Sequence, residues 1–306
     1  MRYGFVGLGS LGAHLAASLA RAGFALTVCD LDRGRAEPLI ALGARFAATP
    51  AEAARASDAV ITCLPSPAAS TRVVEGSGGI LEGLAKGGTW IEMSTNDDAE
   101  IQRLAALGAA KGIATLEAPV TGGVHRAAAG RITILIGGEA AVFARHRLAF
   151  QAMGGEILHM GPLGTASLIK VVTNMLAFIH LLAAGEALML ARKGGLDLAK
   201  AFAAIKASSG NSFVHETESQ LVLNGSYNVG FTMDLACKDL GFAMAYGRKL
   251  GVPLDIAGLT EQTFVRGRAQ YGGGAQSTQI VKLLEDALGA DLRAPGFPAV
   301  LGPEHA

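Results

Sequence analysis

This sequence has no excess of charge of either sign, no even set of cysteines and no segment like a secretory signal at its start. Each of these absences excludes a class of function. Lys plus Arg and Asp plus Glu are both 26, so the formal net charge is zero and no overall field favours nucleic acid or an anionic membrane. The cysteines are odd in number and lack metal-site spacing, which indicates reduced thiols in a cytoplasmic protein. Residues 1–12 do not resemble a secretory signal. We therefore expect no nucleic-acid, membrane or metal partner.

Apolar sequence is abundant, and its pattern changes along the chain. The chain has 306 residues, which is enough for two domains of roughly 100–200 residues each. Half of the residues are hydrophobic, which is enough for a large core. In the first half, short apolar runs alternate with segments of helical spacing, a pattern that predicts a parallel, doubly wound sheet. The strand-like runs are residues 3–9, 24–30, 58–65, 88–95, 113–120, 131–138 and 156–161.

After Gly161 the strand signals nearly vanish and long helical segments take over. We expect helices at about 164–193, 197–208, 234–250 and 277–288. Residues 171–190 are long enough to span a membrane, but the polar residues among them favour a buried helix of a soluble protein. The predicted fold is therefore α/β, with an N-terminal Rossmann-type domain in residues 1–161 and an all-α domain in residues 162–306.

A glycine-rich turn follows the first strand-like run and precedes a helical segment. In a GxGxxG turn, the first glycine permits the tight bend, the second lets the backbone approach a pyrophosphate, and the third allows close helix–strand packing. The expected cofactor-binding residues of this turn are Gly7, Leu8, Gly9, Ser10, Leu11 and Gly12. An ordinary glycine-rich turn is the alternative, but the strand before it and the helix after it favour a dinucleotide site.

Asp30 is the residue predicted to contact the adenosine ribose of the dinucleotide. It lies 23 positions after Gly7 (30 − 7), close to the offset of about 20 that dinucleotide folds use for an acidic residue. Its carboxylate can accept hydrogen bonds from the adenosine ribose, and its charge repels a 2′-phosphate, which favours NAD over NADP. Arg33 points the other way, because an arginine just past this position can meet that phosphate. A solvated residue in a first helical turn is the alternative for Arg33.

Three further motifs carry a resemblance to a known family. They are "EAPVTGG" (117–123), "GPLGTASLIKVVTN" (161–174) and "FTMDLACKDL" (231–240). Together with "GFVGLGSLG" (4–12), they occur in the order and spacing of the β-hydroxyacid dehydrogenases, such as 3-hydroxyisobutyrate dehydrogenase. The sequence therefore resembles this family over nearly its whole length, and four coincident motifs are more specific than any one of them.

The resemblance implies an activity and assigns roles to residues. Family members transfer a hydride between NAD(P) and a small β-hydroxy acid or its semialdehyde, and they form dimers or tetramers built from dimers. The implied catalytic residues are Lys170 and Asn174. The implied substrate-binding residues are Thr121, Gly122, Gly123 and Lys238. The implied cofactor-binding residues beyond the turn and Asp30 are Leu64, Pro65, Thr95 and Lys238. No metal is implied.

Lys170 also stands out without the resemblance, because it lies in the apolar run "SLIKVVTNMLAFIHLL". When a hydride leaves an alcohol carbon, the hydroxyl proton must also leave, and a lysine can accept it if burial lowers its pKa toward neutrality. Ser167, Lys170 and Asn174 are spaced by three and four, so they share one helix face. The alternative is a lysine that snorkels from a core helix to water.

Departures from the family pattern leave the substrate open. The family usually has serine where Thr121 stands and often glycine where Ala166 stands. His125 follows the carboxylate-binding glycines, so it is either a contact to the far end of the substrate or a surface histidine at a helix start. Two other functions are considered: a decarboxylating dehydrogenase of the 6-phosphogluconate type, which has a longer helical domain, and a non-catalytic nucleotide-binding protein on the same fold.

Overall fold

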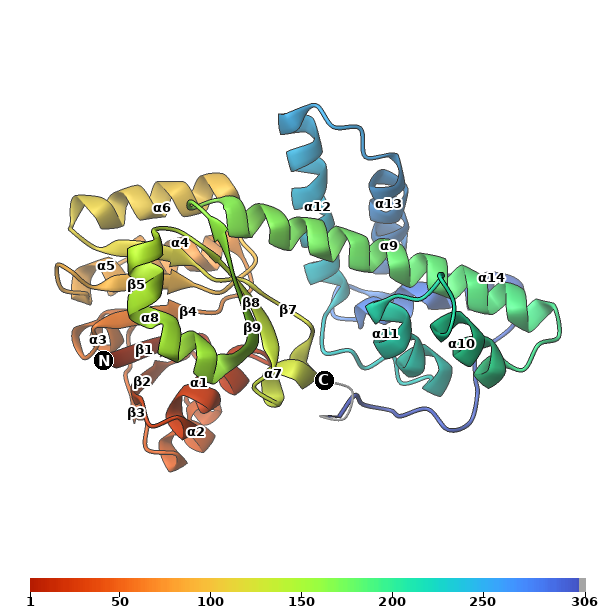
Figure 1. Ribbon diagram of the computed structural model, residues 1–306, viewed down its shortest axis with the longest axis horizontal. Coiled ribbons are helices and arrows are strands. Elements are labelled where there is room, and N and C mark those ends of the chain that lie inside the picture. The colour runs from red at the N-terminus through yellow and green to blue at the C-terminus, as the bar shows by residue number, and fades with distance from the viewer. Residues whose placement is uncertain (303–306) are drawn as a thin grey trace. The chain divides into compact units, whose positions relative to one another are not determined.

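The computed structural model describes residues 1–302 (Figure 1). The end of the expected second domain, residues 303–306, lies outside the described residues. The chain divides into two compact units, one covering Met1–Lys170 and the other beginning at Val171. The first unit is α/β and the second is built from helices, which confirms the predicted fold class.

The first unit holds a sheet that, in the described residues, has nine strands in the order β3-β2-β1-β4-β5-β6-β8-β7, with β9 paired to β8. The strands β1 to β6 are mutually parallel, as predicted. The strand bounds are β1 Arg2–Val6, β2 Ala25–Cys29, β3 Arg45–Phe46, β4 Ala59–Thr62, β5 Thr89–Glu92, β6 Ala114–Glu117, β7 Val120–Thr121, β8 Ile132–Gly137 and β9 Gly154–Gly161.

The far edge of the sheet departs from the all-parallel prediction. Strand β8 runs antiparallel to both β6 and β7, and β9 runs parallel to β8. The run 113–120, expected as one strand, is two strands interrupted at Ala118 and Pro119, because Pro119 has no N–H group for a continuous ladder. Strand β3 was not predicted, since two residues are too short to show a periodic pattern.

Side chains alternate between the two faces of the sheet and build a separate core on each. Tyr3 and Phe5 of β1 belong to the core on the side of helices α1, α7 and α8, whereas Val6 packs on the side of α3, α4, α5 and α6. Helices on both faces define a doubly wound sheet. The helix bounds are α1 Gly12–Arg21, η1 Arg33–Ala36, α2 Glu37–Ala41, α3 Pro50–Arg55, α4 Pro67–Glu75, α5 Ile80–Gly83, α6 Asp98–Ala110, α7 Val124–Ala128 and α8 Ala140–Met153.

The second unit is formed by helices around an apolar core that includes Phe178, Leu240 and Phe264. Helices α11 and α13 were not predicted, because α11 mixes polar residues throughout "FVHETESQ" and α13 has a weakly segregated apolar face. The other expected helices are present. The bounds are α9 Thr165–Lys193, α10 Leu198–Lys206, α11 Phe213–Asn224, α12 Met233–Leu250, α13 Asp255–Tyr271, η2 Ser277–Val281 and α14 Lys282–Leu288.

Helix α9 begins in the first unit and continues into the second. Among residues 1–302 it is the one helix that by length and composition could cross a membrane, and 28% of its most apolar window is buried within the chain. The rest of that window is at least partly accessible in the single chain.

Candidate active site

The residues expected to bind the cofactor gather at one edge of the sheet. Parallel strands bring their carboxyl ends together, and Gly7, Asp30, Leu64 and Thr95 follow the ends of β1, β2, β4 and β5 respectively. The strand order reverses between β1 and β4, and ligands of such sheets bind in the crevice beyond that switch point. The fold therefore brings the predicted cofactor-binding residues to the edge of the sheet where dinucleotides bind in such folds.

The three glycines of the turn differ in what the fold demands of them. Gly7 has a φ of 97°, and a Cβ atom on it would lie 2.3 Å from the carbonyl oxygen of Cys63. A Cβ on Gly12 would lie 2.1 Å from the carbonyl oxygen of Gly7. On Gly9, the nearest atom would be Nη1 of Arg35 at 3.8 Å. The backbone at Gly9 is thus open to a ligand, which fits a bound pyrophosphate.

Asp30 lies directly against this turn. Its Oδ2 accepts a hydrogen bond from the backbone N–H of Leu8 at 2.6 Å, and its Oδ1 accepts one from the N–H of Asp32 at 2.9 Å. The backbone N–H of Gly7 donates to the carbonyl of Cys29 at 3.0 Å. These bonds fix the acidic side chain beside the proposed nucleotide site.

A buried carboxyl that we did not predict supports the next part of the crevice. The backbone N–H of Leu64 donates to Oγ of Ser94 at 2.7 Å, and the N–H of Ser94 donates to Oε1 of Glu92 at 2.9 Å. The hydroxyl of Ser70 donates to the other oxygen of Glu92 at 2.8 Å. Burial raises the pKa of the Glu92 carboxyl. The signal for this residue was an acid inside the apolar run "TWIEM".

The turn expected to hold the substrate carboxylate follows β7. Thr121 ends that strand, and Gly122 and Gly123 have φ angles of 117° and 88°, which disfavour side chains. The side chains of His125 and Arg126 fold back over this turn. A Cβ on Gly123 would lie 3.0 Å from Nδ1 of His125, and one on Gly122 would lie 2.9 Å from Cδ of Arg126.

The residues on α9 and α12 include a second unpredicted acid. Lys170 is 7% exposed, which makes it a buried amine near the start of α9. One turn later, Nδ2 of Asn174 donates to Oδ2 of Asp239 at 2.6 Å, and Nζ of Lys238 lies 2.9 Å from Oδ1 of the same carboxylate. Asp239 thus joins Asn174 to Lys238 in the second unit. Its signal was an acid next to a lysine in "ACKDL".

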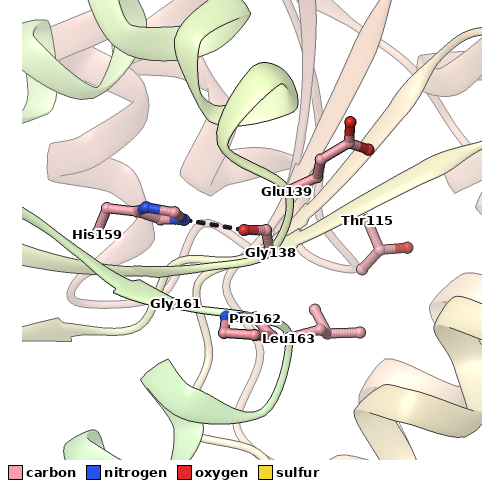
Figure 2. Close-up of a pocket in the computed structure, with 7 residues that line it drawn as sticks. All are labelled: Thr115, Gly138, Glu139, His159, Gly161, Pro162 and Leu163. Atoms are coloured by element: carbon pink, nitrogen blue, oxygen red, sulfur yellow. Dashed lines mark hydrogen bonds between the residues drawn. The ribbon is translucent and has the colours of Figure 1, made fainter.

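A hollow of about 470 Å³ opens elsewhere in the first unit, beside strands β8 and β9 (Figure 2). It is lined by Thr115, Gly138, Glu139, His159, Gly161, Pro162 and Leu163. Inside it, Nε2 of His159 lies 2.9 Å from the carbonyl oxygen of Gly138. None of the predicted site residues lines the hollow.

Thiol and metal chemistry find little support in the described chain. Burial raises the pKa of Cys29 to about 11 and that of Cys63 to about 12, so neither thiol is a thiolate nucleophile near neutral pH. Within residues 1–302, no three His, Cys, Asp or Glu side chains gather closely enough to hold a metal ion.

Known proteins resemble the chain over both units. The family described as the NAD-binding domain of 6-phosphogluconate dehydrogenase matches residues 2–161, and the family described as NAD-binding of NADP-dependent 3-hydroxyisobutyrate dehydrogenase matches residues 164–284. The 2-(hydroxymethyl)glutarate dehydrogenase of Eubacterium barkeri is 32% identical, over 95% of this chain and 97% of its own. The L-threonate dehydrogenase of Cupriavidus necator is 30% identical, over 92% and 95%.

A solved structure shows the same architecture. The 3-hydroxyisobutyrate dehydrogenase of Mycobacterium tuberculosis, solved with L-serine, superposes with a TM-score of 0.83 at 28% identity. The alignment covers 93% of this chain and 99% of that one. The agreement therefore covers both the α/β unit and the helical unit.

Proposed function

Because the chain belongs to the β-hydroxyacid dehydrogenase family, we propose that it interconverts a small β-hydroxy acid and its semialdehyde with NAD as the hydride carrier. The observation that carries the proposal is Lys170, a buried amine on α9 one turn before Asn174. Burial shifts the pKa of a lysine readily, and the reaction needs a base of this kind.

The proposed roles are those that the family resemblance implies, and the positions of the residues support them. The glycine turn and Asp30 hold the dinucleotide, with Leu64, Pro65 and Thr95 beside it at the carboxyl edge. When bound, NAD supplies the hydride acceptor. Thr121, Gly122 and Gly123 bind the substrate carboxylate, and His125 and Arg126 add positive or polar groups beside that turn.

Residues on α9 and α12 are proposed to transfer the hydroxyl proton and to orient the substrate. Lys170 accepts the hydroxyl proton during oxidation and returns it during reduction. Asn174 orients the substrate, and Asp239 holds the Asn174 amide and the Lys238 amine in place through its two oxygens. After it has accepted the proton, the Lys170 ammonium also attracts the carboxylate of the substrate.

The two other functions are less well supported. A decarboxylating sugar-acid dehydrogenase has a longer helical domain, whereas residues 164–284 match the 3-hydroxyisobutyrate dehydrogenase type. A non-catalytic protein on this fold has no need of the lysine or of the two glycines that precede α7, and this chain keeps Lys170, Gly122 and Gly123. We therefore propose a catalytically active enzyme, with the cytoplasmic location that the odd number of cysteines favours.

A rate screen with NAD and NADP tests the proposal. The substrates are the acids named in the relatives: 2-(hydroxymethyl)glutarate, 3-hydroxyisobutyrate, L-threonate and L-serine, with 2-hydroxy-3-oxopropionate for the reverse direction. We expect at least one of them to be turned over with NAD. Binding of NAD without turnover of any acid in the panel would favour the non-catalytic alternative.

The cofactor preference gives a separate prediction. Asp30→Ala should weaken NAD binding and narrow the preference over NADP, because the ribose hydrogen bonds and the repulsion of a 2′-phosphate both disappear. Calorimetric titration of both cofactors measures the change. Arg33→Ala is the matched control. The Arg33 guanidinium already pairs with Glu37 at 3.7 Å and lies 5.2 Å from the ring centre of Phe46, so the preference should hold. A wild type that prefers NADP would refute this role of Asp30.

The helical unit favours assembly with a second copy of the chain. A groove of about 840 Å³ runs between α9, α13 and α14 within this unit, and its lining is largely apolar. Two of its lining residues on α13, Ile256 and Leu259, are exposed apolar side chains, and so are Leu176 and Leu190 on α9. An apolar surface of this extent is typical of a protein interface, and a symmetric dimer would cover it on both copies at once.

We therefore expect a homodimer or homotetramer assembled through the helical unit. Light scattering at micromolar concentration should give at least twice 31.2 kDa. The double variant Ile256→Lys and Leu259→Lys should shift the protein toward the monomer, because it places two charges on the apolar surface. A soluble, active wild-type monomer under these conditions would contradict the prediction.

A further inference from the structure

Glu117 is a buried acid that the proposed chemistry leaves without a role. It ends strand β6 and is 1% exposed. Its Oε1 accepts hydrogen bonds from the backbone N–H groups of Gly164 at 2.8 Å and Ala166 at 2.7 Å. Its Oε2 accepts one from the hydroxyl of Ser167 at 2.5 Å. All three donors belong to the first turn of α9 or to the residue before it.

This arrangement is an unusual way to begin a helix. The first N–H groups of a helix have no partner within it, and a serine, threonine or aspartate just before the first turn commonly supplies one. Here Gly164 precedes α9 and has no side chain, and the acceptor comes from a strand about 50 residues earlier in the sequence. The start of α9 is therefore anchored to the sheet.

Glu117 is also connected to both groups proposed to act on the substrate, the turn that begins at Thr121 and Lys170 on α9. Along the chain, Thr121 lies four residues after Glu117 (121 − 117). The backbone between them is fixed by two hydrogen bonds, from the N–H of Ala118 to the carbonyl of Glu92 at 2.7 Å and from the N–H of Leu135 to the carbonyl of Pro119 at 2.9 Å. Across space, it holds Ser167, which lies on the same helix face as Lys170 about 4.5 Å farther along the axis. One side chain thus links the carboxylate-binding turn to the helix of the lysine.

The surroundings leave little freedom to this link. A Cβ atom on Gly137 of the neighbouring strand would lie 2.2 Å from Oε1 of Glu117, so the carboxyl fits only beside a glycine. The segment that precedes α9 is also hydrogen-bonded to the residue after β8. The N–H of Gly138 donates to the carbonyl of Gly161 at 2.9 Å, next to the hollow that Pro162 and Leu163 line (Figure 2).

We propose that Glu117 is a positioning residue for the hydroxyacid reaction. Its carboxyl fixes the first turn of α9 to the end of β6 and so holds Lys170 in place relative to the turn at residues 121–123. Both oxygens of Glu117 are taken up by the start of α9, so its effect passes through Ser167 and the backbone of α9. The inference depends on the proposed function, because it assigns a role only if Lys170 is the base.

The variants Glu117→Ala and Glu117→Gln separate this role from a merely structural one. Glu117→Ala should lower kcat by about 10²-fold, the order expected when a catalytic group moves by about 1 Å, while the KM of the acid and the NAD affinity change little. Glu117→Gln should restore most of kcat. Its amide oxygen can accept both backbone N–H groups, and its amide nitrogen can donate to the hydroxyl oxygen of Ser167. Steady-state kinetics and NAD titration measure both effects.

Further variants keep the test decisive. Glu139→Ala is the matched control, because Glu139 is an exposed acid of the same unit outside the link, and it should leave kcat unchanged. If Glu117→Ala does not fold, Ser167→Ala decides the question. It removes one of the three bonds and should lower kcat several-fold at constant KM, and Ser167→Thr should restore it.

Two results would overturn the inference. One is wild-type kcat in Glu117→Ala or, where that variant does not fold, in Ser167→Ala. The other is a parallel fall of kcat, NAD affinity and melting temperature that Glu117→Gln does not restore. A failure of the proposed function looks different: the wild type would turn over none of the acids, or Lys170→Ala would be fully active.

Discussion

Lys170→Ala is expected to lower kcat by about 10²–10⁴-fold while the fold and the NAD affinity persist. The hydroxyl proton must leave as the hydride leaves, and Lys170 is the buried amine proposed to accept it. Alanine removes the amine but retains a good helix former within α9. Steady-state kinetics with an acid from the panel, together with calorimetric titration of NAD, separates loss of the chemical step from loss of binding.

Two controls distinguish a proton acceptor from a positive charge. Lys170→Arg puts a permanent positive charge at this position, but a guanidinium stays protonated near neutral pH and cannot accept the hydroxyl proton, so KM for the acid should stay low while kcat stays lost. Lys193→Ala removes a lysine from the other end of the same helix, where its amine donates to the carbonyl of Leu288, and should leave kcat unchanged. Wild-type kcat in Lys170→Ala would remove this residue from the mechanism.

The parts of the protein that were predictable from the sequence depend on local signals. The turn at residues 7–12 and Asp30 lie within a span of two strands and one helix, where glycine placement and apolar runs carry the information. Helix α9 was predicted to within one residue at its start, because its apolar residues keep helical spacing over a long run. The structure places the first unit's cofactor candidates at one edge because parallel strands share that edge.

The parts that were missed depend on contacts between distant segments. Glu117 finds its partners 47 to 50 residues later in the chain, and Asp239 finds Asn174 at a separation of 65 residues. Nothing in the neighbouring sequence of either acid shows such a partner. The direction of β8 was missed for a similar reason, because an apolar run shows that a strand is buried but not which way it runs. Helices α11 and α13 lack a strongly segregated apolar face.

Gly9→Ala is expected to raise the Kd for NAD by roughly 10–100-fold without damage to the fold, the factor that corresponds to about 1–3 kcal/mol of steric conflict with the pyrophosphate. The fold itself does not require glycine here. A Cβ atom on Gly9 would have Nη1 of Arg35 as its nearest neighbour, at 3.8 Å, and the φ angle of Gly9 is not positive. A glycine that its own chain does not require is explained by close approach of a ligand.

Gly12→Ala is the matched comparison, because the same methyl group is added three residues later. There the Cβ would lie 2.1 Å from the carbonyl oxygen of Gly7, so α1 must move away from the end of β1. We expect this variant to lose thermal stability as well as NAD binding, whereas Gly9→Ala should melt close to the wild type. Differential scanning calorimetry without NAD gives the stability, and titration with NAD gives the affinity. If Gly9→Ala binds NAD as tightly as the wild type, the pyrophosphate does not lie on this turn. The dinucleotide crevice would then have to be sought away from the end of β1.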